Sequence, residues 1–159
     1  MSLQKFFNVG FIIYDEFFKN ILLVKGYLGW GLPKGYFEEN DLNFLNTGIR
    51  EVKEEIGIVI DKNKVLDATT SYSLLRYNKK YKKYDWGEKL KGFYFKNIVI
   101  FSTQINKNTV FNIDKNEIKE TLWIPIDKIN NFILASFYPM DEKQKLIRSI
   151  RKINNITIN

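Results

Sequence analysis

Runs of apolar, β-favouring residues open the chain and predict two neighbouring strands. The segments "FFNVGFIIY" at 6–14 and "ILLVKG" at 21–26 flank the polar stretch "DEFFKN", a pattern typical of a hairpin or of adjacent strands. Residues 26–40 contain several glycines and a proline, and we therefore expect this segment to be mostly loop. Additional strands are predicted at 56–60, 64–77, 93–105 and 121–126.

The apolar spacing then changes from that of a strand to that of a helix. Between residues 42 and 56, apolar residues recur every three or four positions. These residues are Leu42, Leu45, Ile49, Val52 and Ile56. Asn40 or Asp41 can serve as the N-cap, and Gly57 stands where a helix commonly ends.

Two more helices are predicted near the C-terminus, at 127–134 and 140–153. Strands and helices alternate without βα regularity, and no linker or repeat divides the chain. We therefore expect a single domain over residues 1–159, of the α+β class, with a mixed sheet flanked by helices.

Composition restricts the chemistry to oxygen ligands. The 159 residues include no cysteine and no histidine, so thiolate and imidazole ligands are absent. A metal site would have to be built from oxygen ligands, which favour magnesium, manganese or calcium. No apolar run is long enough to predict a transmembrane helix, and we expect a cytoplasmic protein without membrane partners. The net charge of +7 suits a polyanion such as a nucleotide or nucleic acid, although a basic surface can also serve solubility alone.

Three glutamates stand at positions i, i+3 and i+4 of the predicted helix. Glu51, Glu54 and Glu55 would project from one face and repel each other. Arg50, four residues before Glu54, can brace that residue, but one arginine does not balance three carboxylates. A divalent cation would balance them, whereas a solvated helix face is the alternative for a segment such as "EVKEE".

The segment from 35 to 58 resembles the Nudix box, G-x5-E-x7-R-E-U-x-E-E-x-G-U, in which U is a bulky aliphatic residue. Gly35 matches the first glycine, and "REVKEEIGI" at 50–58 matches the second half at every defined position. The preceding "WGLPKG" resembles the corresponding loop of diadenosine polyphosphate hydrolases and mRNA-decapping enzymes. Arg50 lies fifteen positions after Gly35, one more than in the family. Asp41 or Leu42 therefore takes the place of the upstream glutamate.

The resemblance implies a Nudix-type α/β/α sandwich with a mixed β-sheet and the Nudix loop-helix-loop. It also implies hydrolysis of a nucleoside diphosphate linked to another group, by attack of water on phosphorus. Glu51, Glu54 and Glu55 would bind Mg²⁺ or Mn²⁺ together with the backbone carbonyl of Lys34, and Arg50 would orient the carboxylates. The divalent ions would neutralise phosphate oxygens and activate the attacking water.

The resemblance also suggests a general base, because many family members supply a glutamate from a loop before a tryptophan-bearing strand. Glu117 and Glu120 precede Trp123 by six and three residues. We prefer Glu117 as the base, with Glu120 second, and two ordinary surface acids as the alternative. Lys34 and Gly35 are expected to contact the substrate.

The segment at 76–91 combines six lysines with aromatic residues. Its lysines can meet phosphates while Tyr84 and Trp86 stack on bases, although a solvated hairpin tip is the alternative. The preferred substrate is a dinucleoside polyphosphate such as diadenosine tetraphosphate. An RNA 5′-end pyrophosphohydrolase or decapping enzyme is the second hypothesis, and inositol pyrophosphates also suit a basic pocket. A non-catalytic Nudix-fold nucleotide-binding module is the hypothesis from another class, and the three retained glutamates argue against it.

Overall fold

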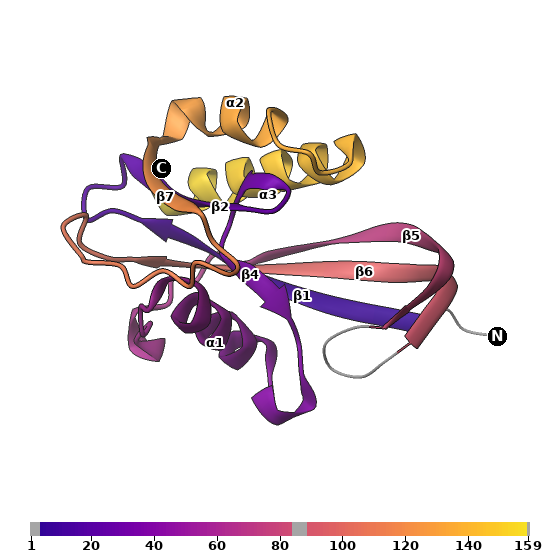
Figure 1. The fold of residues 1–159 in the computed structure, drawn as a ribbon. Coiled ribbons are helices and arrows are strands. Elements are labelled where there is room, and N and C mark those ends of the chain that lie inside the picture. The colour runs from indigo at the N-terminus through magenta and orange to yellow at the C-terminus, as the bar shows by residue number, and fades with distance from the viewer. Residues whose placement is uncertain (1–3, 84–88, 159) are drawn as a thin grey trace.

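The computed structural model describes the backbone of residues 4–83 and 89–158, and the side chains of these residues except at 80–83, 89 and 90. Within these ranges, seven strands form one mixed sheet between two helical layers (Figure 1). Helix α1 (Phe44–Ile56) covers one face, and α2 (Ile129–Leu134) and α3 (Met140–Ile158) cover the other. The α/β/α arrangement predicted from the sequence is therefore confirmed.

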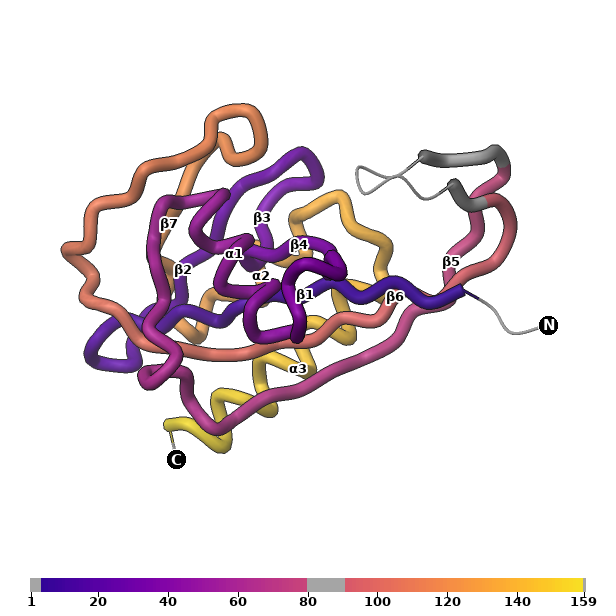
Figure 2. Tube along the Cα trace, turned by 90° about the horizontal axis from the view of Figure 1, so that it is seen from below, coloured from indigo at the N-terminus to yellow at the C-terminus, as the bar shows by residue number. Residues whose placement is uncertain are grey.

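The sheet is built around β1, which pairs with β6 in parallel along its whole length. The strand order is β3-β2-β1-β6-β5, with β4 added to β1 and β7 added to β2, and all pairs other than β1–β6 are antiparallel. The long β5–β6 pair runs out to one side of the helices in both views (Figures 1 and 2). The strands are β1 (Gln4–Tyr14), β2 (Asn20–Gly26), β3 (Gly29–Gly31), β4 (Lys34–Tyr36), β5 (Thr70–Lys83), β6 (Lys89–Gln104) and β7 (Glu120–Pro125).

The inner strands are buried on both faces, which explains why their sequences are continuous apolar runs. On β1, Phe11 and Ile13 pack toward α1, whereas Ile12 and Tyr14 pack toward α2 and α3. Successive side chains of a strand point to opposite faces, so a strand between two helical layers needs apolar residues at every position. Two core clusters, one on each side of the sheet, hold the sandwich together.

The start of α1 differs from the sequence prediction. The helix begins at Phe44, and Asn43 is its N-cap, because the Asn43 side chain accepts the backbone N–H of Asn46 at 2.8 Å. The predicted caps, Asn40 and Asp41, are wrong, because both residues belong to a short 3-10 helix before α1. The predicted end is confirmed at Gly57, which has a φ of 76°.

Several other boundaries also differ. The run at 56–60 was predicted as a strand but forms none, and Ile60 is instead buried in the core beside α1. The predicted loop at 26–40 contains the three-residue strands β3 and β4. The two C-terminal helices are confirmed, with the second extending to Ile158. None of the helices in the described ranges is long and apolar enough to cross a membrane.

Candidate active site

Strand β4 turns one backbone edge toward α1. Its flanking residues Pro33 and Phe37 hydrogen bond with β1. In an antiparallel pair, residues that hydrogen bond with the partner strand alternate with residues that do not. Lys34 and Tyr36 therefore direct their N–H and C=O groups away from β1. The carbonyl of Tyr36 accepts Nη2 of Arg50 at 2.9 Å. This edge of β4, which includes the Lys34 carbonyl, therefore faces the polar side of α1.

Gly35 leaves the space that Glu51 occupies. A Cβ atom at position 35 would lie 1.9 Å from the carboxyl carbon of Glu51, so this carboxylate packs directly on the backbone of β4. The first glycine of the box is thus a steric requirement of the glutamate sixteen positions later.

Arg50 holds the acidic residues of α1 and of the preceding loop together. Its Nε and Nη2 atoms donate to the two carboxylate oxygens of Asp41 at 2.7 and 3.0 Å. Its Nη1 atom lies 2.8 Å from Oε1 of Glu51 and 3.1 Å from Oε2 of Glu54. Arg50 therefore contacts three carboxylates, and its role in orienting them stays a prediction. Burial opposes ionisation of Asp41, but the hydrogen bonds from Arg50 outweigh it and lower the Asp41 pKa.

The extra residue between Gly35 and Arg50 is accommodated at Leu42. Asp41, the last residue of η1 (Glu39–Asp41), keeps its contact with Arg50, and Asn43 caps α1. Leu42 lies between them with a φ of 70° and is 84% exposed. Asp41 and not Leu42 therefore stands in the place of the family's upstream glutamate, and the insertion is an exposed bend that leaves the helix undisturbed.

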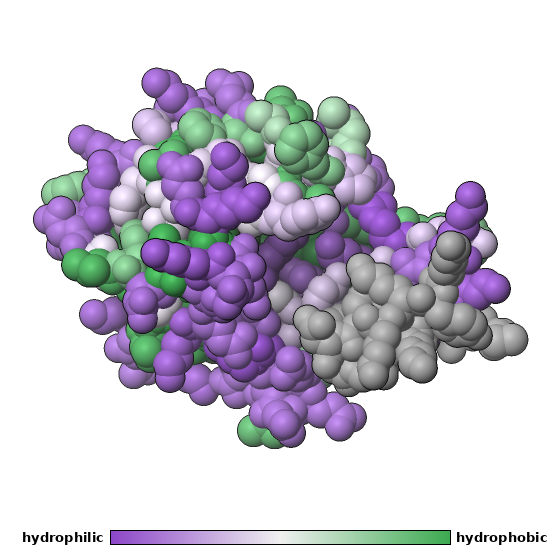
Figure 3. Space-filling view, viewed as in Figure 1, coloured by the Kyte–Doolittle hydropathy of each residue, from purple (hydrophilic) through white to green (hydrophobic). Residues whose placement is uncertain are grey.

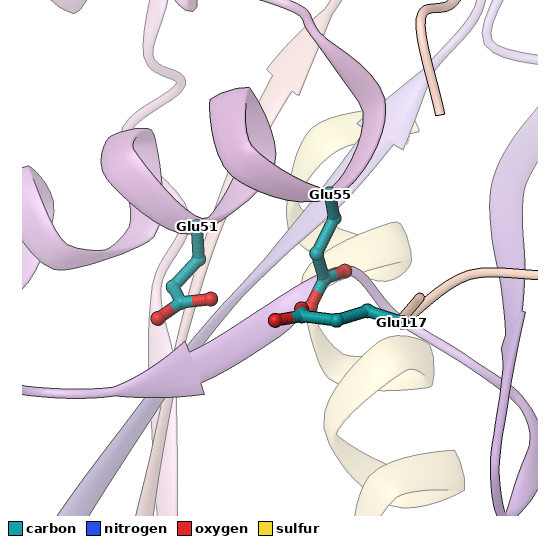
Figure 4. Close-up of side chains that lie close together, drawn as sticks. All are labelled: Glu51, Glu55 and Glu117. Atoms are coloured by element: carbon teal, nitrogen blue, oxygen red, sulfur yellow. The ribbon is translucent and has the colours of Figure 1, made fainter. Parts of the chain in front are cut away.

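Glu51 and Glu55 converge with Glu117, which comes from a loop on the other side of the site (Figure 4). One carboxylate oxygen of each residue lies within 4.8 Å of the others. The Oε2 atom of Glu55 is buried and has no hydrogen-bond partner among the described residues. A site made of carboxylate oxygens, one of them desolvated and unpaired, fits Mg²⁺ or Mn²⁺. Glu54 lies at the rim with its side chain 51% exposed, outside this group.

The close carboxylates disfavour each other's ionisation. Burial raises the pKa of Glu55 to about 8, helped by the charges of Glu51 and Glu117 and opposed by a hydrogen bond from the backbone of Lys34. Burial also raises the pKa of Glu51 to about 7, despite the neighbouring Arg50. The charge cluster inferred from the sequence is thus electrostatically strained without a cation.

The end of α1 fixes the loop that carries Glu117. The backbone N–H groups of Asn112 and Asp114 donate to the carbonyls of Ile56 and Glu55 at 2.9 and 3.0 Å, which satisfies two acceptors that a helix end leaves open. The N–H of Glu117 then donates to the carbonyl of Asp114 at 3.1 Å. These bonds explain why Glu117 reaches the glutamates of α1.

Not all predicted site residues lie in the same place. Glu120 is exposed at the start of β7, opposite Lys25, and does not line the cleft. Tyr84 and Trp86 lie outside the described residues. The predictions for these two aromatic residues therefore stay predictions.

A cleft of about 550 Å³ extends from the glutamates past Lys34. Figure 3 shows hydrophilic residues gathered over α1 and the segment before it, with a hollow between this part and the part formed by α2 and α3. The Nζ atom of Lys34 lies 4.5 Å from the ring centre of Tyr138, and burial lowers the pKa of this lysine. Asn8 and Tyr138 also line the cleft, and the sequence analysis missed both. The sequence could have indicated Asn8, because it is a polar residue inside an apolar strand. Nothing in the sequence indicated Tyr138.

Comparison with known proteins agrees with this geometry. The NUDIX domain model matches residues 5–143, and the chain therefore belongs to the Nudix family. Together with the box glutamates, this membership makes it a Nudix pyrophosphohydrolase.

Solved structures with the same fold cover nearly the whole chain. A C. elegans Ap4A hydrolase, in a binary complex, has a TM-score of 0.63 at 16% identity, over 96% of this chain and 98% of that chain. The E. coli dihydroneopterin triphosphate pyrophosphohydrolase has a TM-score of 0.62 at 14% identity, over 99% of each chain. The NUDIX domain of Shewanella oneidensis NrtR, complexed with ADP ribose, has a TM-score of 0.60 at 16% identity, over 99% of this chain and 91% of that chain. At these identities the likeness establishes the fold alone.

Proposed function

We propose that this chain hydrolyses a dinucleoside polyphosphate, such as diadenosine tetraphosphate, with the help of Mg²⁺ or Mn²⁺. The observation that carries the proposal is the convergence of Glu51, Glu55 and Glu117 at the mouth of a cleft that also contains Lys34. Carboxylates hold the cation, and the lysine ammonium in the cleft suits the phosphates.

Different residues of the site bind the cation and position its ligands. Glu51, Glu55 and the Lys34 carbonyl hold the cation, with Glu54 at the exposed side. When bound, such an ion neutralises phosphate oxygens and makes phosphorus more susceptible to water. Arg50 fixes the position of Glu51 and does not contact the substrate, because its donors are already occupied by Asp41, Glu51, Glu54 and Tyr36.

Glu117 takes the proton of the attacking water. Its carboxylate lies at the other side of the site from α1 (Figure 4), and the chain has no histidine to do this. The same placement would suit an additional cation ligand, which is the alternative role for Glu117. Glu120 is not preferred, because it is not among the residues that line the cleft.

The size of the cleft supports a small substrate. A volume of about 550 Å³ is typical of small-molecule sites. The second hypothesis is an RNA 5′ end, and its supporting observation is that the long β5–β6 pair runs out to one side of the helices (Figure 1) and that the lysine-rich segment of the sequence begins on β5 at Arg76. A binding module without catalysis is the third, and the complete set of box glutamates argues against it.

A substrate screen tests the proposal. Dinucleoside tetraphosphates, nucleoside triphosphates, capped RNA and triphosphorylated RNA are incubated with the protein and Mg²⁺, and the products are resolved. We expect the fastest turnover with a dinucleoside tetraphosphate and no turnover in EDTA. Faster turnover of either RNA would favour the RNA-end hypothesis, and tight nucleotide binding without any turnover would favour the binding module.

A further inference from the structure

Asn8 has a buried acceptor without a partner. The residue is 4% exposed, lies on β1 and lines the cleft, as Lys34 does. Its Oδ1 atom has no hydrogen-bond partner among the described residues. Leaving such an atom desolvated destabilises the folded protein. A group that arrives with the substrate would supply the missing hydrogen bond.

The pairing of β1 with β4 places Asn8 on the same face of the sheet as Lys34. Asn8 is opposite Tyr36 and Gly10 is opposite Lys34, and paired residues share a face of the sheet. A Cβ atom at position 10 would lie 3.2 Å from Cβ of Lys34, so the glycine gives the lysine room on this face. Asn8 and Lys34 are therefore neighbours on the face of the sheet that α3 covers.

The chemistry of an unpaired acceptor restricts its partner. Phosphate oxygens are acceptors at neutral pH and would be repelled by Oδ1, so the partner must carry an N–H or O–H group. In the proposed dinucleoside polyphosphate, such donors belong to the nucleosides. The phosphates thus belong at the glutamates and Lys34, and the nucleoside belongs at Asn8.

The walls of the cleft favour the base over the sugar. Leu32, Tyr36 and Tyr138 line the cleft with Asn8, and these apolar and aromatic side chains suit a flat ring. Ribose would bring two adjacent hydroxyl groups, each of which is both a donor and an acceptor, whereas a base amino group offers only N–H donors, which match an acceptor without a partner. Glu55 Oε2 is the other buried unpaired atom of the described cleft residues, and it belongs to the cation site.

We propose that Asn8 is a specificity residue that accepts a hydrogen bond from the exocyclic amino group of a nucleobase, as in adenine. This inference rests on the proposed nucleotide hydrolysis and goes beyond it, because it assigns the two ends of the cleft to different parts of the substrate.

Equilibrium binding of nucleoside monophosphates tests the inference without requiring turnover. The probes are AMP, purine riboside monophosphate, which lacks the amino group, and 2′-deoxy-AMP, measured by calorimetry in Mg²⁺. We expect AMP to bind about tenfold more tightly than purine riboside monophosphate, the effect of one hydrogen bond to an acceptor that is already desolvated. Loss of the 2′-hydroxyl should change the affinity less than twofold.

Variants at position 8 assign this preference to Asn8. Asn8→Leu should bind AMP and purine riboside monophosphate equally and melt no lower than wild type, because it removes an unsatisfied buried atom. Asn8→Asp should keep the preference, because it keeps the acceptor. The matched control is Asn116→Leu, an exposed asparagine of the same cleft, which should also keep the preference.

Three results would overturn the inference: equal binding of AMP and purine riboside monophosphate to wild type, a preference that survives Asn8→Leu, or a larger loss with 2′-deoxy-AMP. Absence of binding by all three monophosphates would overturn it as well. Failure of the proposed function would be seen separately, as lack of turnover in the substrate screen while the AMP preference and its loss in Asn8→Leu persist.

Discussion

Replacing Glu55 by Gln should make the protein more stable in the absence of metal and inactive in its presence. Glu55 is 6% exposed, and its Oε2 atom has no hydrogen-bond partner among the described residues. Gln has nearly the same shape, and its amide oxygen can still accept the hydrogen bond from the backbone of Lys34. The substitution therefore removes a buried group that must take up a proton on folding, and it preserves the packing of α1.

The size of the effect follows from the raised pKa. Burial and the neighbouring Glu51 and Glu117 raise the pKa of Glu55 from 4.5 to about 8, so the folded protein holds a proton that the unfolded chain releases. The free energy of unfolding therefore falls as the pH rises from 4.5 to 8. At about 1.4 kcal/mol per pH unit, the loss by pH 7 is about 3 kcal/mol. Because Glu51 is coupled to Glu55, the effects of the two residues do not add.

Thermal melting in EDTA at several pH values measures this effect. At pH 7, Glu55→Gln should melt about 6–10 °C above wild type, and at pH 5 the difference should nearly vanish. The control is Glu54→Gln, whose side chain is half-exposed and should change the free energy of unfolding by less than about 0.5 kcal/mol. Saturating Mg²⁺ should raise the melting temperature of wild type more than that of Glu55→Gln.

Two results would refute this reasoning. A metal-free Glu55→Gln protein that melts below wild type at pH 7 would show that the carboxylates do not strain the fold. An equal response of both proteins to Mg²⁺ would show that Glu55 does not hold the cation. Turnover near the wild-type rate in the variant would lead to the same conclusion.

Four further variants test the remaining parts of the site. Glu117→Gln should lower kcat by about 10² to 10⁴ with unchanged Mg²⁺ affinity by calorimetry, and lost affinity would make Glu117 a cation ligand. Gly35→Ala should displace the carboxylate of Glu51, whose carbon would lie 1.9 Å from the new methyl group, and weaken Mg²⁺ binding at least about tenfold; unchanged affinity would contradict the packing argument. Asp41→Asn should lower the free energy of unfolding by about 2 kcal/mol at pH 7. Burial alone would raise the Asp41 pKa, but hydrogen bonds from Arg50 hold it below 3.8, so this stabilisation is present above pH 3.8 and the urea-unfolding difference should shrink as the pH falls below that value. Hydrolysis of a dinucleoside tetraphosphate should stay within about threefold and depend weakly on salt after four lysines are changed to Ser, namely Lys79, Lys80, Lys82 and Lys83.

The sequence by itself determined the parts of the site that depend on local spacing. The three- and four-residue periodicity placed Glu51, Glu54 and Glu55 on one face of α1, and this face is polar because the opposite one packs in the core. The glycine at 57 ended the helix as predicted. Cation chemistry followed from composition, because a chain without cysteine and histidine leaves only oxygen ligands.

The prediction from apolar spacing was wrong at the start of α1, where the apolar period and a contact between charged residues favour different first residues of the helix. Leu42 continues the apolar period of α1, yet it lies in an exposed bend because Asp41 is held by Arg50 nine residues later. That contact between two charged groups decided the start of the helix. The periodicity alone contained no information about it.

Only the tertiary structure decided which distant residues complete the site. Glu117 and Glu120 looked nearly equivalent in sequence, but the carbonyls at the end of α1 bind the loop before Glu117 and bring this residue to the glutamates. Asn8 became a candidate because pairing with β4 and β6 buries it beside the cleft. Closing a long loop costs entropy, and a single contact does not offset that cost. Contacts between residues far apart in the chain therefore form only when the whole sandwich packs cooperatively. Local periodicity therefore predicted the glutamate helix, whereas the long-range packing brought Glu117 to the glutamates of α1 and buried Asn8 beside the cleft.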